Sequence, residues 1–102
     1  MPRSPPPETP CALCGRACPL TFHHLIPRKM HRRPRFRKRH DRATLDAGVW
    51  LCRPCHSGIH RLHDEMTLAQ SLCTLEALRA DPAVARHVAW VRRQRVPRPR
   101  EP

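Results

Sequence analysis

The pattern of apolar and polar residues in the first half of the chain predicts two short strands and a helix. Residues 20–26 (Leu-Thr-Phe-His-His-Leu-Ile) have β-rich character and a proline on each side, which is typical of one arm of a hairpin. Residues 49–51 (Val-Trp-Leu) predict a second strand that leads directly into Cys52. The segment 55–62 fits a short helix whose apolar contacts are Ile59 and Leu62.

The second half of the chain, residues 64–95, has the pattern of consecutive helices. Residues 67–70 (Thr-Leu-Ala-Gln) match a capping box, so we expect one helix to begin there. Thr74 is placed to cap a second helix that ends near residue 79, and Asp81 followed by proline predicts the start of a third. The apolar positions of the third helix share one face: Val84, Val88 and Val91. We therefore expect a helical extension that supports the first half.

Between the two predicted strands lies a strongly basic segment, residues 28–42. It carries nine Lys and Arg residues and only two apolar side chains, Met30 and Phe36. We expect a charged loop or insertion outside the core. The whole chain is also strongly basic, with 20 Lys and Arg residues against 8 Asp and Glu residues. Such a field attracts polyanions, and nucleic acid is the usual polyanionic partner of a protein, although a merely solvated basic surface is the simpler alternative.

Composition limits how much core the chain can build. Its 102 residues suffice for one domain, but only 39% are hydrophobic and 4% aromatic. Small chains of this kind usually gain stability from disulfides or a metal ion. The first residues lack the apolar region of a secretory signal, and no run is long enough to span a membrane. We therefore expect a cytoplasmic protein with reduced thiols and no membrane contact, flanked by a disordered Pro-rich arm (1–10) and a basic Pro-rich tail (96–102).

Two Cys-x-x-Cys pairs form the strongest motif in the sequence: Cys11 and Cys14, then Cys52 and Cys55. Four thiolates suit tetrahedral Zn²⁺, and a closed site of this type is structural. The second pair lies at the start of the predicted helix, which is a treble-clef arrangement. A redox pair or buried apolar cysteines are the alternatives, and two pairs argue against both. Cys18 and Cys73 lack such a partner, although Cys18 could replace Cys14 as a ligand.

Four histidines indicate a second metal site. His56 and His60 are four residues apart in the predicted helix, so both imidazoles can reach one ion. One histidine of the adjacent pair His23 and His24 would give three nitrogen ligands and leave positions open for water and substrate, which is the layout of a catalytic site. Because successive strand residues face opposite sides, the other member of the pair is a candidate general base. His63 could replace His60 on the same helix face.

We expect the remaining aromatic rings to have ordinary roles. The histidines outside the two clusters should be solvated or should face the polyanion: His31, His40, His63 and His87. The two tryptophans, Trp50 and Trp90, should belong to the core because the chain has so few aromatic residues.

Taken together, these motifs resemble those of the HNH endonucleases, which share a ββα-metal fold. The resemblance rests on Cys-x-x-Cys at 11–14, His-His-Leu-Ile-Pro-Arg at 23–28 and Leu-Cys-Arg-Pro-Cys-His-Ser-Gly-Ile-His at 51–60. It covers residues 11–63 and implies an α+β fold, with a zinc-stabilised treble-clef or ββα-metal core before the helical extension. It also implies that His23 is a metal ligand together with His56 and His60, while His24 is the general base.

The activity that this resemblance implies is hydrolysis of a DNA phosphodiester bond by a single divalent ion, which leaves 5′-phosphate and 3′-hydroxyl ends. We expect Mg²⁺, Mn²⁺, Ni²⁺ or Zn²⁺ at the histidines, in addition to the structural zinc. The middle HNH residue is usually Asn, but the chain contains none, and Asp46 or Ala47 stands at that spacing. Asp46 either orients His24 through its carboxylate or caps a turn. The expected phosphate contacts are Arg28, Lys29, Arg32, Arg33, Arg35, Arg37, Lys38, Arg39 and Arg53.

Two other functions fit the same residues. One is a non-catalytic zinc module that binds nucleic acid, and the other is an interaction module such as other treble clefs provide. The four histidines favour the nuclease, whereas the missing Asn and the heavy positive charge favour the binding module. We expect double-stranded DNA as the partner, while monomer and dimer both stay open.

Overall fold

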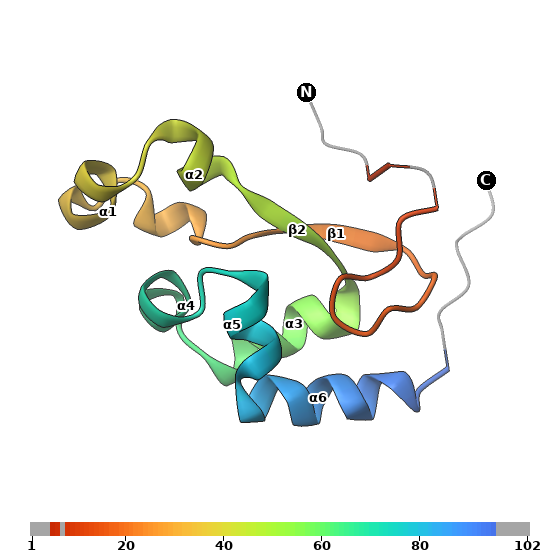
Figure 1. Ribbon diagram of the computed structural model, residues 1–102. Coiled ribbons are helices and arrows are strands. Elements are labelled where there is room, and N and C mark those ends of the chain that lie inside the picture. Colours follow the sequence, from red (N-terminus) through yellow and green to blue (C-terminus); the bar gives the residue numbers. More distant parts are fainter. Residues whose placement is uncertain (1–4, 7, 96–102) are drawn as a thin grey trace.

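The computed structural model describes residues 5–6 and 8–95 of the chain (Figure 1). The predicted arm at 1–10 therefore falls partly, and the predicted tail at 96–102 entirely, outside the described residues. As expected, the chain folds as a small α+β protein. Its elements in order are β1 (Leu20–His24), η1 (Arg28–Met30), α1 (Pro34–Arg39), α2 (Arg42–Asp46), β2 (Gly48–Cys52), α3 (Arg53–Leu62), α4 (Glu65–Ser71), α5 (Leu75–Ala80) and α6 (Pro82–Arg92).

The two strands pair in antiparallel register, with Phe22 opposite Trp50 and His24 opposite Gly48. Gly48 fits this register because a side chain there would overlap the carbonyl oxygen of His23 and the ring of Phe22. The first strand ends at His24, two residues earlier than expected, since Ile26 turns away into a separate apolar cluster. Trp50 is half-buried, and its ring meets that of Phe22 edge-on at 5.1 Å.

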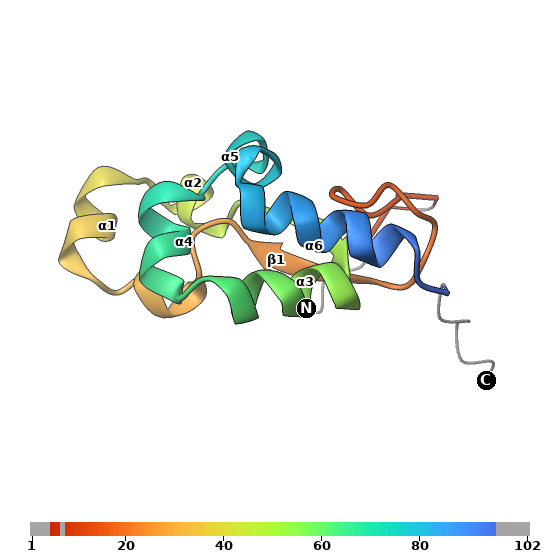
Figure 2. The same cartoon turned by 90° about the horizontal axis from the view of Figure 1, so that it is seen from below.

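Helix α3 follows β2 without a gap and lies between the sheet and α6 (Figure 1). The view from below shows α3 and α6 side by side (Figure 2). Their close approach depends on Gly58, because a β-carbon there would overlap the ring of His87. That ring donates a hydrogen bond from Nε2 to the carbonyl oxygen of Pro54, 2.9 Å away. The predicted helix 55–62 is thus present, with two further residues at its start.

The three C-terminal helices each begin at a side-chain cap. Asp64, Thr74 and Asp81 accept hydrogen bonds from the backbone amides three residues on. The caps at Thr74 and Asp81 are those predicted, but the start predicted at Thr67 is wrong. The carboxylate of Asp64 accepts the Thr67 amide proton at 2.8 Å, so Thr67 lies inside the first turn of α4.

One apolar core joins the helical extension to the first half of the chain. Leu51 and Ile59 from the first half pack in the same cluster as Leu68, Leu78 and Val84, and the four paired cysteines belong to it as well. Arginine side chains add polar links between the two parts. Arg92 donates to the carbonyl oxygens of Cys14 and Leu13 at 3.1 and 3.2 Å, and Arg79 donates to Ala12 at 2.9 Å.

The valine face predicted for α6 is buried, but Trp90 is not. Val84, Val88 and Val91 are all buried, whereas Trp90 is 51% exposed. Its indole ring stacks on His87, with ring centroids 5.7 Å apart. The expectation that Trp90 belongs to the core is therefore wrong. None of the helices in the described part of the chain is long and apolar enough to cross a membrane.

The basic segment 28–42 is not the loop that its charge suggested. It forms η1, α1 and the first residue of α2, and its two apolar side chains, Met30 and Phe36, are buried. They pack with Ile26 and Ala69 in a second, smaller core. Leu45 of α2 packs on the same cluster, so apolar contacts join these short helical turns to α4 while the long basic side chains are exposed. An ion pair of 3.7 Å between Lys29 and Glu65 reinforces the contact of η1 with α4.

Candidate functional site

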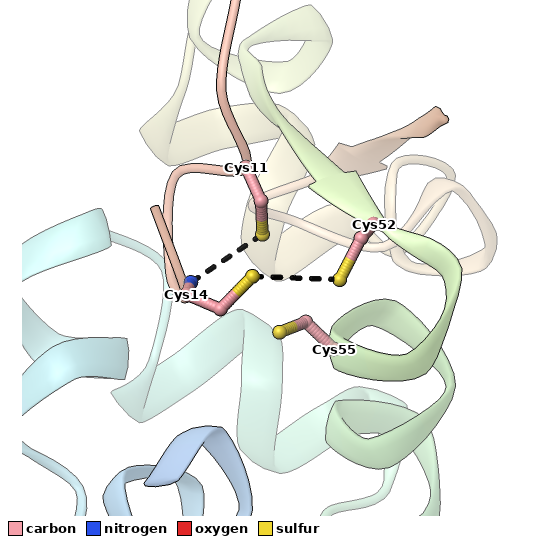
Figure 3. Close-up of side chains that lie close together, drawn as sticks. All are labelled: Cys11, Cys14, Cys52 and Cys55. Carbon is pink, nitrogen blue, oxygen red and sulfur yellow. Dashed lines mark hydrogen bonds between the residues drawn. The ribbon is translucent and has the colours of Figure 1, made fainter. Parts of the chain in front are cut away.

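The four paired cysteines meet at one point beside the sheet (Figure 3). Cys11 and Cys14 lie in the turn before β1, Cys52 ends β2, and Cys55 lies in the first turn of α3. Gly15 adopts a left-handed backbone conformation (φ 76°), and its amide donates to the carbonyl oxygen of Cys11 at 2.9 Å, which closes the turn.

The geometry of these thiols suits a zinc ion. The Sγ atoms of Cys14 and Cys52 are 3.8 Å apart. A tetrahedron with Zn–S bonds of about 2.3 Å has edges of about 3.8 Å, whereas a disulfide would bring the sulfurs to about 2.05 Å. All four cysteines are buried, so neither water nor substrate could reach an ion held there. The four cysteines could therefore hold a structural zinc, as predicted.

The electrostatics of the cluster also favour a bound dication. A hydrogen bond from the Cys55 thiol lowers the pKa of Cys11 to about 4, while burial raises the pKa of Cys52 to about 12 and hydrogen bonding to Cys11 raises that of Cys55. In the bare cluster, one ionised thiolate therefore opposes ionisation of its neighbours. A dication removes this opposition, because it stabilises all four thiolates together.

Cys18 does not take the place of Cys14 in this cluster. Its thiol is half-buried and donates to the carbonyl oxygen of Arg16, with Sγ 3.4 Å from that oxygen. The cysteine ligand set found within the described residues is the predicted one. Cys73 lies elsewhere, beside the second core.

A second cluster contains His23 from β1 with His56 and His60 from α3. The ring centroids are separated by 5.1 Å (His23 and His56), 5.4 Å (His23 and His60) and 5.0 Å (His56 and His60). One nitrogen from each ring lies within 4.8 Å of the other two. The three imidazoles could therefore hold one metal ion, and the i, i+4 spacing brings the two α3 histidines together as expected.

His23 is the buried member of this cluster and has an unsatisfied atom. It is 1% exposed, and its Nε2 has no hydrogen-bond partner among the described residues. Leaving a buried ring nitrogen without a partner costs about 1–3 kcal/mol. An ion bound between the three rings would supply the missing partner.

The protonation of these rings suits ligation at neutral pH. Burial lowers the pKa of His23 to about 3, with smaller contributions from the positive charges of His56, His60 and His24. Burial, followed by the charges of His60 and Arg53, also lowers the pKa of His56. Neutral imidazoles keep a lone pair free for a metal ion, which is the form that ligation requires.

Thr21 is part of this site, although it was not identified from the sequence. Its Oγ1 lies 2.8 Å from Nδ1 of His56 and 3.0 Å from the carbonyl oxygen of Leu51. The signal that could have revealed it is the strand periodicity. Residues two apart in a strand share a face, so Thr21 and His23 both point toward α3.

His24 lies outside the three-histidine cluster, beside the other residues proposed for catalysis. It is half-buried, and its ring contacts those of Phe22 (5.0 Å) and His31 (5.6 Å). It lines a cavity of about 710 Å³ together with Arg28 and Asp46. Asp46 forms a 3.8 Å ion pair with Arg42, and Ala47 ends α2 without entering the cavity lining.

The other histidines are half-buried and contact groups within the protein, so they are not fully solvated, and the expectation that they face a polyanion stays a prediction. His31 donates to the carbonyl oxygen of Ile26 at 2.7 Å, and His40 stacks on Phe36. His63 follows the last residue of α3 and is bonded to Asp81 at 2.9 Å, so it does not replace His60 in the cluster.

The residues proposed to contact phosphate are exposed, and they do not form a single face. They are Arg28 and Lys29 in η1, Arg32 and Arg33 after it, Arg35, Arg37, Lys38 and Arg39 in α1, and Arg53 at the start of α3. Arg28 and Arg37 line a cavity with Asp46, whereas Arg35 and Arg39 line another with Gln70 and Cys73 of the α4 region. The short helix α1 thus presents basic residues in two directions.

The fold and the two clusters define a small α+β protein whose four buried cysteines could hold a zinc ion. The chain is 39% identical over 85 residues to YisB of Bacillus subtilis (strain 168), a match that spans 82% of this chain and 74% of YisB. The chain belongs to the YisB family. No protein-family model and no solved structure matches it.

Proposed function

We propose that this protein is a metal-dependent endonuclease or nickase of the HNH type that hydrolyses phosphodiester bonds of DNA. In this proposal β1, β2 and α3 form a treble-clef or ββα-metal core around a structural zinc. The order strand, strand, helix supports it, as does the position of the second cysteine pair across the junction of β2 and α3.

One observation carries the proposal: a buried, unpartnered imidazole nitrogen at the centre of a three-histidine cluster. His23 has no hydrogen-bond partner for its Nε2 among the described residues, and His56 and His60 offer their nitrogens to the same point. A three-nitrogen site leaves coordination positions open, unlike the closed four-cysteine site. His56 and His60 also border a surface depression with Ser57 and Arg61, so their side of the cluster is accessible.

The proposed ligands of the ion are His23, His56 and His60, and the ion is Mg²⁺, Mn²⁺, Ni²⁺ or Zn²⁺. When bound, such an ion polarises a phosphate oxygen and neutralises charge that develops on the leaving oxygen. The histidine donor set favours the transition metals, whereas Mg²⁺ prefers oxygen ligands.

His24 is the proposed general base. Neutral imidazole accepts the proton of a water molecule as that water attacks the phosphorus atom, and His24 lies at a cavity large enough to admit a nucleotide. Arg28 in the same cavity supplies a positive charge for a phosphate oxygen. Asp46 replaces the usual Asn in this proposal. Either it helps to orient His24, or its role is confined to the ion pair with Arg42.

The proposed partner is double-stranded DNA, held chiefly through phosphate contacts. The excess of Lys and Arg supports a polyanionic partner, and Arg28 and Arg37 line a cavity that adjoins the proposed catalytic one. Arg53 is a further candidate contact, because its charge is close enough to lower the pKa of His56.

A non-catalytic zinc module that binds nucleic acid is the second candidate. Two observations favour it. The chain contains no Asn for the middle HNH position, and the number of its basic residues is much larger than the number that line the proposed catalytic cavity. In that case the three histidines would hold a second structural ion or none.

Plasmid nicking separates the two candidates. We expect the wild-type protein to cut supercoiled DNA with Mn²⁺, Ni²⁺ or Mg²⁺, and EDTA to stop it. His24→Ala should abolish cutting while leaving DNA binding intact, whereas His63→Ala, a histidine outside the metal cluster and outside the cavities of His24 and Arg37, should cut normally. Absence of cutting with every ion, or full activity of His24→Ala, would refute the catalytic proposal. Retained DNA binding would then favour the second candidate.

A further inference from the structure

The hydroxyl of Thr21 forms two hydrogen bonds that involve two different kinds of atom. It lies 3.0 Å from the carbonyl oxygen of Leu51 in β2 and 2.8 Å from Nδ1 of His56 in α3. The carbonyl oxygen can only accept a hydrogen bond, whereas Nδ1 of a neutral imidazole either donates or accepts, depending on the tautomer.

Proton counting assigns both bonds. A hydroxyl has one proton, and the bond to the Leu51 carbonyl uses it, because a carbonyl oxygen can only accept. Nδ1 of His56 must therefore carry its own proton and donate it to a lone pair of the Thr21 oxygen. The opposite arrangement would direct the hydroxyl proton to Nδ1, leave the Leu51 carbonyl without this donor and place the imidazole proton on Nε2.

We propose that Thr21 is a positioning residue that holds His56 in its Nδ1–H tautomer and so presents the lone pair of Nε2 to the three-histidine cluster. This inference rests on the proposed metal site, since a protonated Nε2 could not bind an ion. Ligating histidines commonly have their second nitrogen bound to a fixed acceptor, which sets the ring orientation as well as the tautomer. Here the acceptor is a β-branched side chain with few rotamers, on a strand paired to β2.

The same bonds connect the two candidate metal sites. Leu51 immediately precedes Cys52, and His56 immediately follows Cys55, so the chain Leu51, Thr21, His56 links both sides of the second cysteine pair. Folding of the cysteine site thus places the carbonyl that orients Thr21, and Thr21 in turn orients His56.

The first test is the tautomer itself, measured without any ion at the histidines. Protein loaded with one equivalent of zinc, which we expect the cysteines to take up, is examined at pH 7.5 by long-range ¹H–¹⁵N correlation of the imidazole rings. We expect His56 to show a protonated Nδ1 and an unprotonated Nε2. Thr21→Ser, which keeps the hydroxyl, should give the same pattern, while Thr21→Val should lose the preference. A protonated Nε2 in wild-type His56 would overturn the proposal.

The second test is ion affinity, measured by calorimetric titration of the same zinc-loaded proteins with Ni²⁺. We expect Thr21→Val to weaken binding about 10- to 100-fold, the range typical of lost partners behind a ligand. Thr21→Ser should bind within about threefold of the wild type, as should Thr67→Val, which removes a threonine hydroxyl from α4. Wild-type affinity in a folded Thr21→Val would overturn the proposal. Should Thr21→Val not fold, the wild-type tautomer and Thr21→Ser still decide.

Failure of the proposed function gives a different result from failure of this inference. A wild-type protein that bound no second ion, but kept the His56 proton on Nδ1, would refute the metal site and support the role of Thr21 in setting the tautomer. A protein that cut DNA with its His56 proton on Nε2 would support the proposed function and refute the role of Thr21.

Discussion

His63 and Asp81 are joined by a hydrogen bond, with Nε2 of the imidazole 2.9 Å from Oδ2 of the carboxylate. His63 follows the last residue of α3, and Asp81 is the N-cap of α6. The same Oδ2 accepts the amide proton of Val84 at 3.0 Å. The hydrogen bond from His63 lowers the pKa of Asp81. One carboxylate oxygen therefore caps α6 and ties it to the end of the helix that bears His56 and His60.

Substitution of Asp81 should separate these two roles. Asp81→Asn keeps an oxygen that can cap α6 but removes the charge beside His63, so we expect a loss of stability below about 1 kcal/mol. Asp81→Ala loses both and should cost about 1–2 kcal/mol. Urea unfolding at pH 7 measures the stability of both variants. Thr74→Ala is the matched control, because the uncharged hydroxyl of Thr74 caps α5 at 3.0 Å. Equal losses for Asp81→Ala and Thr74→Ala would contradict the additional role of Asp81.

The cysteine cluster gives a prediction about zinc removal. Cys52→Ser removes one thiolate from a buried set of four, so we expect the protein to lose its zinc and its cooperative thermal transition, since zinc binding supplies folding free energy in small sites of this type. Zinc content and circular dichroism melting measure this, and EDTA should act in the same direction on the wild type. Cys73→Ser, outside the cluster, should keep its zinc. A stable Cys52→Ser protein with one bound zinc would rule out the four-cysteine site.

His23 should make stability depend on pH in a known direction. Its pKa is lowered to about 3 in the folded protein, chiefly by burial, whereas an unfolded histidine titrates near its ordinary value of about 6.5. Below pH 6.5 the unfolded chain therefore takes up a proton that the folded protein refuses. The contribution of neutral His23 to the free energy of unfolding is therefore present above pH 6.5. It is lost as the pH falls toward 3, by at most about 1.4 kcal/mol per pH unit.

Comparison with His23→Gln isolates this contribution from acid loss of zinc, which affects both proteins. We expect the difference in unfolding free energy between wild type and His23→Gln to stay constant above about pH 7.5. Between about pH 7.5 and 5 it should shift by about 2 kcal/mol against the wild type. Urea unfolding at several pH values provides the measurement. Parallel pH curves for the two proteins would show that the folded state does not suppress protonation of His23.

Features that depend on neighbouring residues could be predicted from the sequence. The cap at Thr74, the Asp81–Pro82 start of α6 and the two strands follow from patterns of a few residues. The two clusters could be predicted for a related reason: Cys-x-x-Cys and His-x-x-x-His spacings place ligands on one turn or one helix face. The pairing of β1 with β2 then brings the segments that carry these ligands together.

Features that depend on distant contacts could not be predicted. Charge density concealed the burial of Met30 and Phe36, because their partners, Ile26 and Ala69, lie in other elements. No motif distinguishes Arg92 from the other arginines, yet it bonds the carbonyl oxygens of Leu13 and Cys14, 79 and 78 residues away. No local pattern encodes such pairs.

The two cavities on either side of α1 give the sharpest prediction about nucleic acid. Arg37 and Arg42 line a cavity that shares Arg28 and Asp46 with the cavity of His24, whereas Arg35 and Arg39 line the cavity toward α4. A DNA strand that reaches His24 should therefore pass Arg37 and Arg42 and leave the other pair in solvent.

Two double variants of equal net charge test this path: Arg37→Gln/Arg42→Gln and Arg35→Gln/Arg39→Gln. Each phosphate contact contributes about 0.9 to the slope of log affinity against log salt concentration. We expect the slope to flatten by about 1.8 for the first variant, which loses two contacts, and to change little for the second. Fluorescence anisotropy with a labelled duplex between 50 and 200 mM NaCl provides the measurement, with His24→Ala as the background so that cleavage does not interfere. Equal flattening in both variants would mean that DNA senses only the overall charge of this basic region, and the proposed path past Arg37 to His24 would then be wrong.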